Sequence, residues 1–281
     1  MLNFFPNKVF VAHQGQGGSG RGLSPRLWCH VHNSAMPSNG LNNCFALADD
    51  FLSYGVIDVD NEVGISASLA GVYGSYENTG GDILQRTDTD GGVIRLKVDD
   101  DDNDETHIQS GGNVGTMFRI REDSPLTIFE MRYALVEITT VSSFAGLCGT
   151  DQAVTDNLVD STGEIADNHF LGFHTLAATP ARLDFVYRRN GEDKQLAIQD
   201  VHTMVAGEFV KVGFVWNPRR PSWQRLEVYV NNVSVGTVSG DAVEADTFPN
   251  VRLAWNCGAK THAAANRHVD VDWWAAYQEA V

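Results

Sequence analysis

The sequence predicts an all-β protein, built as a two-sheet antiparallel sandwich with an irregular N-terminal arm. Apolar and polar residues alternate in short segments over much of the chain, which is the period-two pattern of half-buried strands. Turn dipeptides such as Asn190-Gly191 separate these segments and favour antiparallel hairpins. A chain of 281 residues is long enough for one large β-sandwich domain.

The segment from residue 182 to 238 shows this pattern most clearly. In its first strand Leu183, Phe185 and Tyr187 fall on one face, and charged residues dominate the other. The segment has no helical period, so we expect an antiparallel meander with one buried and one solvated face. Its strands are predicted at 182–188, 195–198, 209–216, 224–230 and 233–238.

The remaining elements follow in chain order. Residues 1–50 are rich in Gly, Asn and Ser with aromatic side chains placed singly, so we expect an extended arm there and one domain over residues 51–281. The stretch 151–169 is polar with weak helical character. Further strands are predicted within 49–68, at 93–98, in a hairpin over 107–120, in a longest strand over 126–140, and at 143–149, 170–174, 251–256 and 269–277.

Several stretches of this pattern match a known group of folds. They are GEFVKVGFVWN, LEVYVNNVSVGTV and HVDVDWWAAYQE, with GGVIRLKVDDDDNDETHIQSGG, LTIFEMRYALVEI and FAGLCGTD upstream. Through them the chain from about residue 80 to 281 resembles the concanavalin A-like (lectin/glucanase, laminin-G-like) jelly rolls. More narrowly, it resembles the version found in virion structural proteins of tailed bacteriophages. The resemblance implies a concanavalin A-like jelly roll, and it is carried by strands and turns and not by a catalytic signature.

Charge and hydropathy argue against two classes of partner. Asp and Glu number 36 against 20 Lys and Arg, and the net charge of −16 repels phosphate backbones, so we expect no nucleic-acid partner. No apolar run approaches the ~20 residues of a membrane-spanning helix, and the first residues lack the features of a signal peptide. We therefore expect no membrane partner and folding in a cytoplasm.

No pattern predicts a cofactor or a resident metal. Asp99–Asp104 contains five aspartates in six positions, which could chelate calcium, but the loop lacks EF-hand spacing and a solvated turn is favoured. His30 and His32 flank one residue without the spacing of a known zinc module. The four cysteines are scattered, so we expect buried free thiols.

The catalytic residues of glucanase-type members are missing. Laminarinase-type members carry Glu-x-Asp-x-x-Glu on one strand, so that all three carboxylates point into the cleft. Here Glu130 and Glu137 are seven residues apart and face opposite ways, and Asp270 and Asp272 are followed by no Glu. The sequence also lacks a Gly-x-Ser-x-Gly nucleophile motif. We therefore predict that the protein is not an enzyme and has no catalytic residues.

The first functional prediction is a bacteriophage virion structural protein. Its predicted role is a capsid decoration (cement) protein on the outer surface of the head, made in the host cytoplasm and bound to the major capsid protein lattice. We expect a homo-oligomer, with a trimer favoured, and a tail or fibre component that contacts host glycans is the nearby variant. The N-terminal arm would carry the attachment, because single aromatic side chains in a segment without its own core are buried only against something else. These partner-binding candidates are Phe4, Phe5, Phe10 and Trp28.

Two alternatives stay open. The arm could instead fold back on its own sandwich. The function could instead be that of a carbohydrate-binding, lectin-like module, which would use aromatic platforms. Trp223, in the Pro-flanked loop NPRRPSWQ, is the tryptophan expected to be exposed, whereas Trp255, Trp273 and Trp274 lie in strands whose aromatic residues are expected in the core.

Overall fold

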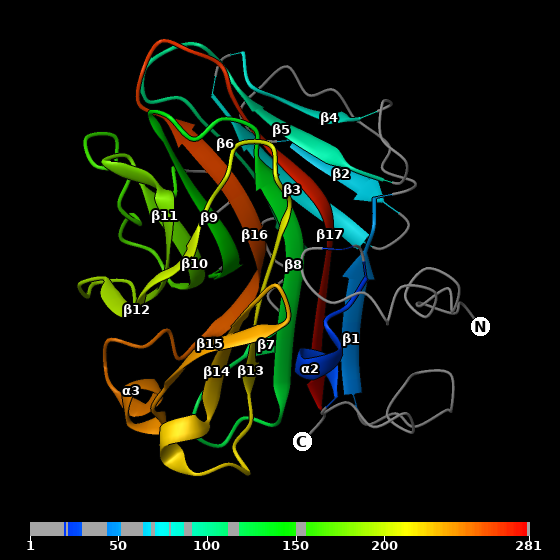
Figure 1. The fold of residues 1–281 in the computed structure, drawn as a ribbon, viewed down its shortest axis with the longest axis vertical. Coiled ribbons are helices and arrows are strands. Elements are labelled where there is room, and N and C mark those ends of the chain that lie inside the picture. Colours follow the sequence, from blue (N-terminus) through cyan, green and yellow to red (C-terminus); the bar gives the residue numbers. More distant parts are fainter. Residues whose placement is uncertain are drawn as a thin grey trace.

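The protein is an all-β sandwich of two antiparallel sheets, as predicted (Figure 1). The structure is a computed structural model, which describes residues 20, 22–29, 44–51, 64–68, 71–78, 80–86, 92–111, 118–149 and 156–279. Helix is confined in these residues to short pieces, namely α2 (Pro25–Trp28), α3 (Gly240–Glu244) and the 3-10 turn η4 (Ser222–Gln224).

Sheet A holds eight strands. The long final strand β17 lies in its middle and pairs on one side with β8 and on the other with β5 and β1. In spatial order sheet A contains β15 (Val233–Val238), β14 (Leu226–Val230), β13 (Val210–Trp216), β8 (Thr127–Leu135), β17 (Arg267–Glu279), β5 (Ile94–Val98) and β4 (Asp82–Gln85), with β1 (Cys44–Asp49) beside β17.

Sheet B holds nine strands, with β9 and β16 near its centre. Figure 1 shows β16 running along the length of the molecule, like β8 and β17 of sheet A. In spatial order sheet B contains β12 (Gln195–Thr203), β11 (Thr179–Arg188), β10 (Phe170–Leu176), β9 (Val141–Cys148), β16 (Arg252–Thr261), β6 (Glu105–Ser110), β3 (Gly71–Glu77) and β2 (Gly64–Ser68), with β7 (Phe118–Arg119) paired to β16.

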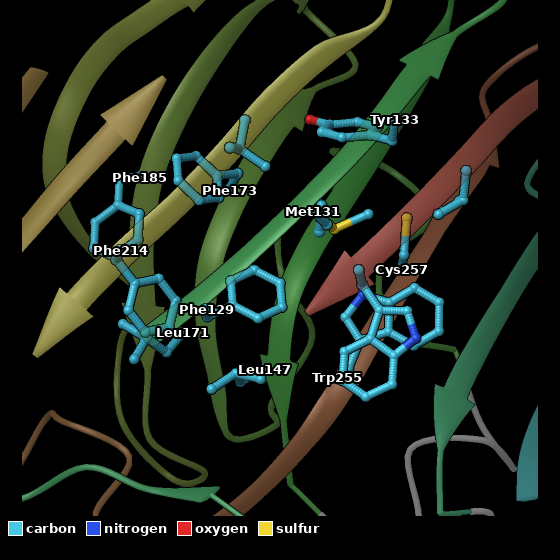
Figure 2. Close-up of a cluster of buried hydrophobic side chains, with 14 of the residues drawn as sticks. Phe129, Met131, Tyr133, Leu147, Leu171, Phe173, Phe185, Phe214, Trp255 and Cys257 are labelled. Carbon is cyan, nitrogen blue, oxygen red and sulfur yellow. The ribbon is translucent and has the colours of Figure 1, made fainter. Parts of the chain in front are cut away.

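The main core fills the space between the two sheets. Alternate residues of each strand point into it, because successive side chains of a strand point to opposite faces. Trp255 of sheet B stacks on Trp274 of sheet A with the ring centroids 5.0 Å apart, and Phe185 meets Phe214 at 5.9 Å. Figure 2 shows how residues of both sheets interleave in this core, among them Phe129, Met131, Tyr133 and Phe214 of sheet A and Leu147, Leu171, Phe173, Phe185, Trp255 and Cys257 of sheet B.

The prediction of one continuous meander over residues 182–238 is wrong. The strands are present, but β11 and β12 form a hairpin in sheet B, whereas β13, β14 and β15 form a meander in sheet A. The chain crosses between the sheets after β12. Met204 is buried in the main core there, and the Gly207 amide, at a φ of +73°, donates to the Leu135 carbonyl of sheet A. The segment is uniform in its sequence pattern, but long-range contacts such as that of Gly207 with Leu135 divide its strands between the two sheets.

Two further expectations are corrected. The predicted hairpin over residues 107–120 does not form, because β6 and β7 both pair with β16 and not with each other. The predicted weak helix over 151–169 is absent from the described part, residues 156–169. There Leu158 and Ile165 form an isolated antiparallel bridge instead.

Candidate functional site

The loop over residues 156–169 lies on the outer face of sheet B. Leu158 and Ile165 are buried there against side chains of β9, β10 and β11 that point away from the main core. This small second core excludes water from the centre of the face and holds the loop by apolar burial. The strand residues that contribute to it are Phe144, Cys148, Phe170 and Val186.

A buried lysine holds the start of this loop. The Lys260 ammonium on β16 is fully buried, donates to Asp156 at 2.7 Å and to Asp160 at 2.5 Å, and lies 3.6 Å from the Glu105 carboxylate. Glu105 also accepts hydrogen bonds from the backbone amides of residues 157 and 158. Burial by itself would lower the pKa of Lys260, but attraction to Glu105, Asp156 and Asp160 outweighs burial and raises the pKa. The charged lysine thus serves as the cation that ties the loop to the sheet.

One pair beneath the loop has the form of a nucleophile and its base. Ser142 Oγ lies 2.9 Å from His262 Nε2, and His262 Nδ1 lies 3.0 Å from the Asp160 carbonyl. Gly163 covers the pair so closely that a Cβ at this position would lie 1.7 Å from Ser142 Oγ. Ser142 is fully buried beneath Gly163, and the contact of His262 with the Asp160 carbonyl holds the loop.

The carboxylates singled out in the sequence are engaged in structural contacts. Asp270 accepts from Arg86 at 2.6 Å and from Arg95 at 2.7 and 2.9 Å. Asp272, which is fully buried, accepts from Arg132 at 2.5 Å. Such charge-assisted bonds fix the position of a carboxylate. That the protein is not an enzyme stays a prediction.

The strap, which we define as residues 22–29, lies on the outer face of sheet A. Trp28 donates its indole N–H to Glu130 at 2.7 Å, and the Ser24 amide donates to the same carboxylate oxygen at 3.0 Å. Lys211 contacts the Gly22 carbonyl at 3.3 Å. Burial raises the pKa of Glu130, whereas the strap hydrogen bonds and Lys211 oppose the rise. Leu27 completes a small apolar cluster with Leu126, Ile128, Val215, Tyr229 and Tyr277.

These contacts bear on the predicted attachment residues. Trp28 is half-buried against the chain's own sandwich, whereas Phe4, Phe5 and Phe10 lie outside the described residues. Cys44–Asp49 pairs with β17 as β1, so this part of the 1–50 segment is a strand of sheet A. The division into an arm and a domain over 51–281 stays a prediction, as does the role of the four aromatic residues.

Trp223 stands apart from the other tryptophans. Its side chain on η4 is 62% exposed, the largest exposure among the large hydrophobic residues that the structure describes. Its predicted exposure is confirmed, and so is the burial of Trp255, Trp273 and Trp274. Exposed tryptophan is uncommon, because its large apolar surface favours burial.

The loop beneath Trp223 is firmly held. The Asn217 amide donates to the Arg225 carbonyl at 2.7 Å and closes the loop at its base. Ser222 Oγ donates to Asp241 at 2.9 Å, which joins η4 to α3. A ring exposed on a fixed loop loses little conformational entropy when a ligand binds to it. Trp223 is therefore an exposed aromatic residue on a loop that is held in place.

The remaining predictions on metals and cysteines have mixed outcomes. In the described parts of the chain no three His, Cys, Asp or Glu side chains form a group that could hold a metal ion, and His30 and His32 lie outside those parts. The predicted lack of a resident metal stays a prediction. Cys148 and Cys257 are buried free thiols as expected, but Cys29 is exposed, because it follows the last turn of α2.

No helix in the described ranges is long and apolar enough to cross a membrane.

Comparisons by sequence and by structure give different results. No protein-family model matches the sequence, and no curated protein matches it. A solved protein of unknown function from Shewanella oneidensis MR-1 has a TM-score of 0.52 and 8% identity, over 93% of this chain and 97% of its own. The carbohydrate recognition domain of Emp47p has a TM-score of 0.51 and 10% identity, over 86% and 99%.

A third neighbour is a β-1,3-1,4-glucanase (lichenase) derived from a mouse hindgut metagenome. Its TM-score is 0.51 at 12% identity, over 83% of this chain and 98% of its own. Likeness at such low identity shows the fold alone. The narrower resemblance to bacteriophage virion proteins stays a prediction. The two antiparallel sheets and these neighbours together show that the chain has the concanavalin A-like jelly-roll fold of lectin and glucanase domains.

Proposed function

We propose that the protein is a non-catalytic carbohydrate-binding module whose platform is Trp223. The observation that carries the proposal is the 62% exposure of this ring on a fixed loop. One face of a pyranose ring presents C–H groups, and packing them on an indole buries apolar surface from both partners. The fold it shares with the carbohydrate recognition domain of Emp47p supports the proposal.

The outer face of sheet B supports a non-catalytic function. The loop over residues 156–169 covers its centre, and Gly163 closes over Ser142 and His262. The carboxylates Asp270 and Asp272 are engaged by arginines on sheet A. A glycosidase needs two carboxyl groups placed on either side of a sugar bond. Asp270 and Asp272 are instead placed as structural ion-pair partners of arginines.

Capsid decoration remains a second proposal, and it rests on the resemblance to virion proteins. If the N-terminal segment attaches the protein to a capsid, its anchors must come from residues other than the strap, because the strap is docked on sheet A. Incubation of the purified full chain with empty, expanded phage heads, followed by sedimentation, tests this proposal. Failure to co-sediment with any head would contradict it.

A binding experiment tests the carbohydrate proposal. The wild type, Trp223→Ala and Leu196→Ala are applied to an array that carries laminarin, lichenan, cello-oligosaccharides, mannan and complex glycans. Leu196 is the matched control, because it is 48% exposed and lacks a ring. We expect Trp223→Ala to lose at least tenfold in affinity and Leu196→Ala to bind like the wild type. Equal loss in both variants, or binding that survives Trp223→Ala, would contradict the platform.

A further inference from the structure

We infer, on the basis of the carbohydrate-binding function proposed above, that the Trp223 platform selects neutral saccharides and discriminates against uronic acids and other anionic sugars. The inference rests on the charges around η4. A protein that recognises a sugar carboxylate commonly uses an arginine that is able to form a bidentate pair with it. Recognition of an anionic sugar at Trp223 therefore requires a nearby arginine that has no carboxylate partner.

Each arginine of the Trp223 loop already has a carboxylate partner. Arg219 makes a two-pronged contact, since both of its terminal nitrogens reach the Glu279 carboxylate. The other two arginines are mostly buried along their side chains, so they are held in place. The pairs are Arg219–Glu279 at 2.7 Å, Arg220–Glu227, and Arg225–Glu244 at 3.7 Å.

One carboxylate in contact with η4 has no cationic partner among these arginines. Asp241 is exposed and accepts a hydrogen bond from Ser222, the residue next to Trp223. Three guanidinium groups thus face four carboxylates around η4. A second acidic group of α3, Glu244, is itself exposed, and carboxylate oxygens accept hydrogen bonds from sugar hydroxyls.

An anionic sugar meets two costs at this surface. It must either displace a carboxylate from one of the three ion pairs or approach Asp241 without compensation. The net charge of −16 adds a long-range repulsion that slows its encounter. A neutral sugar meets neither cost, because it packs on the indole and donates hydroxyl hydrogens to oxygens that are already negative.

The test compares neutral sugars with oxidised partners of the same linkage. Cello-, laminari- and manno-hexaose and their C6-oxidised uronate counterparts are titrated into the full chain by calorimetry in 20 mM and 500 mM NaCl. We expect the neutral form to bind at least fivefold more tightly than its oxidised counterpart at low salt. This ratio of affinities should decrease at high salt, where the Debye length falls to about 4 Å. Asp241→Asn keeps an acceptor for Ser222 but removes the negative charge. It should therefore decrease the ratio of affinities for neutral and oxidised sugars at low salt by on the order of threefold.

The outcomes separate the two claims. Equal or tighter binding of the oxidised sugars, lost in Trp223→Ala, would overturn the selectivity and leave the carbohydrate-binding function standing. Absence of binding by every neutral and oxidised sugar would contradict both. A neutral preference that Asp241→Asn leaves unchanged at low salt would contradict the electrostatic cause.

Discussion

The Lys260 cluster gives the sharpest stability prediction. Lys260→Met keeps an unbranched apolar stem of nearly the same length but removes the ammonium group from between Glu105, Asp156 and Asp160. Removing one partner of a buried ion pair costs about 3–5 kcal/mol. Asp156 and Asp160 are partly solvated, with 34% and 64% of their side chains exposed, but Glu105 has no exposure, so we expect a loss of about 3 kcal/mol.

Chemical denaturation with the variant and its controls measures this loss. A loss of this size corresponds to a decrease in Tm of roughly 6 to 12 °C for a domain of this size. Lys97→Met is the matched control, because Lys97 is one-third exposed and lies 4.0 Å from Asp99, so it should cost less than ~0.5 kcal/mol. Adding Glu105→Gln to Lys260→Met should not restore the stability, because each Glu105 oxygen accepts a backbone amide and the nitrogen of a glutamine side chain cannot accept one. A single-variant loss below ~1 kcal/mol would refute the claim that Lys260 ties the loop to the sheet.

Four shorter predictions follow from other contacts. Glu130→Ala should free the strap and speed tryptic cleavage after Arg26, whereas Glu137→Ala should not; unchanged cleavage would contradict the role of Glu130 as the anchor. Burial lowers the pKa of His174 to about 3, below that of an unfolded histidine at 6.5, so stability should fall by up to ~1.4 kcal/mol per pH unit as the pH drops below 6.5. In urea titrations from pH 7 to pH 4, His174→Gln should flatten this slope, and a slope equal to the wild type would show that other groups cause it. The raised pKa of Lys260 predicts that its stabilisation persists to about pH 10.5 and is lost as the pH rises through the higher folded value; Lys260→Met should lack that alkaline loss in thermal melts. EDTA should leave the wild-type Tm unchanged, and a decrease of several degrees that calcium reverses would revive the calcium alternative for Asp99–Asp104.

The strands were predictable because their signal is local. Alternation at Leu183, Phe185 and Tyr187 places three buried side chains of β11 correctly, and Asn190-Gly191 lies at the hairpin turn as expected. The assignment of strands to sheets was not predictable in this way. It depends on the crossing near Met204 and Gly207, whose contacts are made with residues distant in sequence.

In the candidate site, too, local sequence reveals some residues and only the fold reveals others. Trp223 was identifiable because Pro218 and Pro221 precede it in a short loop and oppose its burial in a strand. Lys260 and Glu105 are 155 positions apart, and neither stands out in its own segment, so their pairing requires the strand order β9–β16–β6. Trp28 was identified as an anchor, but its contact with Glu130 joins residues 102 positions apart, and only the fold reveals it.

Nuclear magnetic resonance of the indole groups tests the central claim, binding at Trp223, most directly. The six tryptophans of the chain should give six indole N–H signals, and Trp223→Phe identifies one of them by its disappearance. During titration with a neutral glycan that the wild type binds, we expect this signal to shift with saturation while those of the buried Trp216, Trp255 and Trp274 stay fixed. Saturable binding that leaves the Trp223 signal in place would contradict the proposed platform.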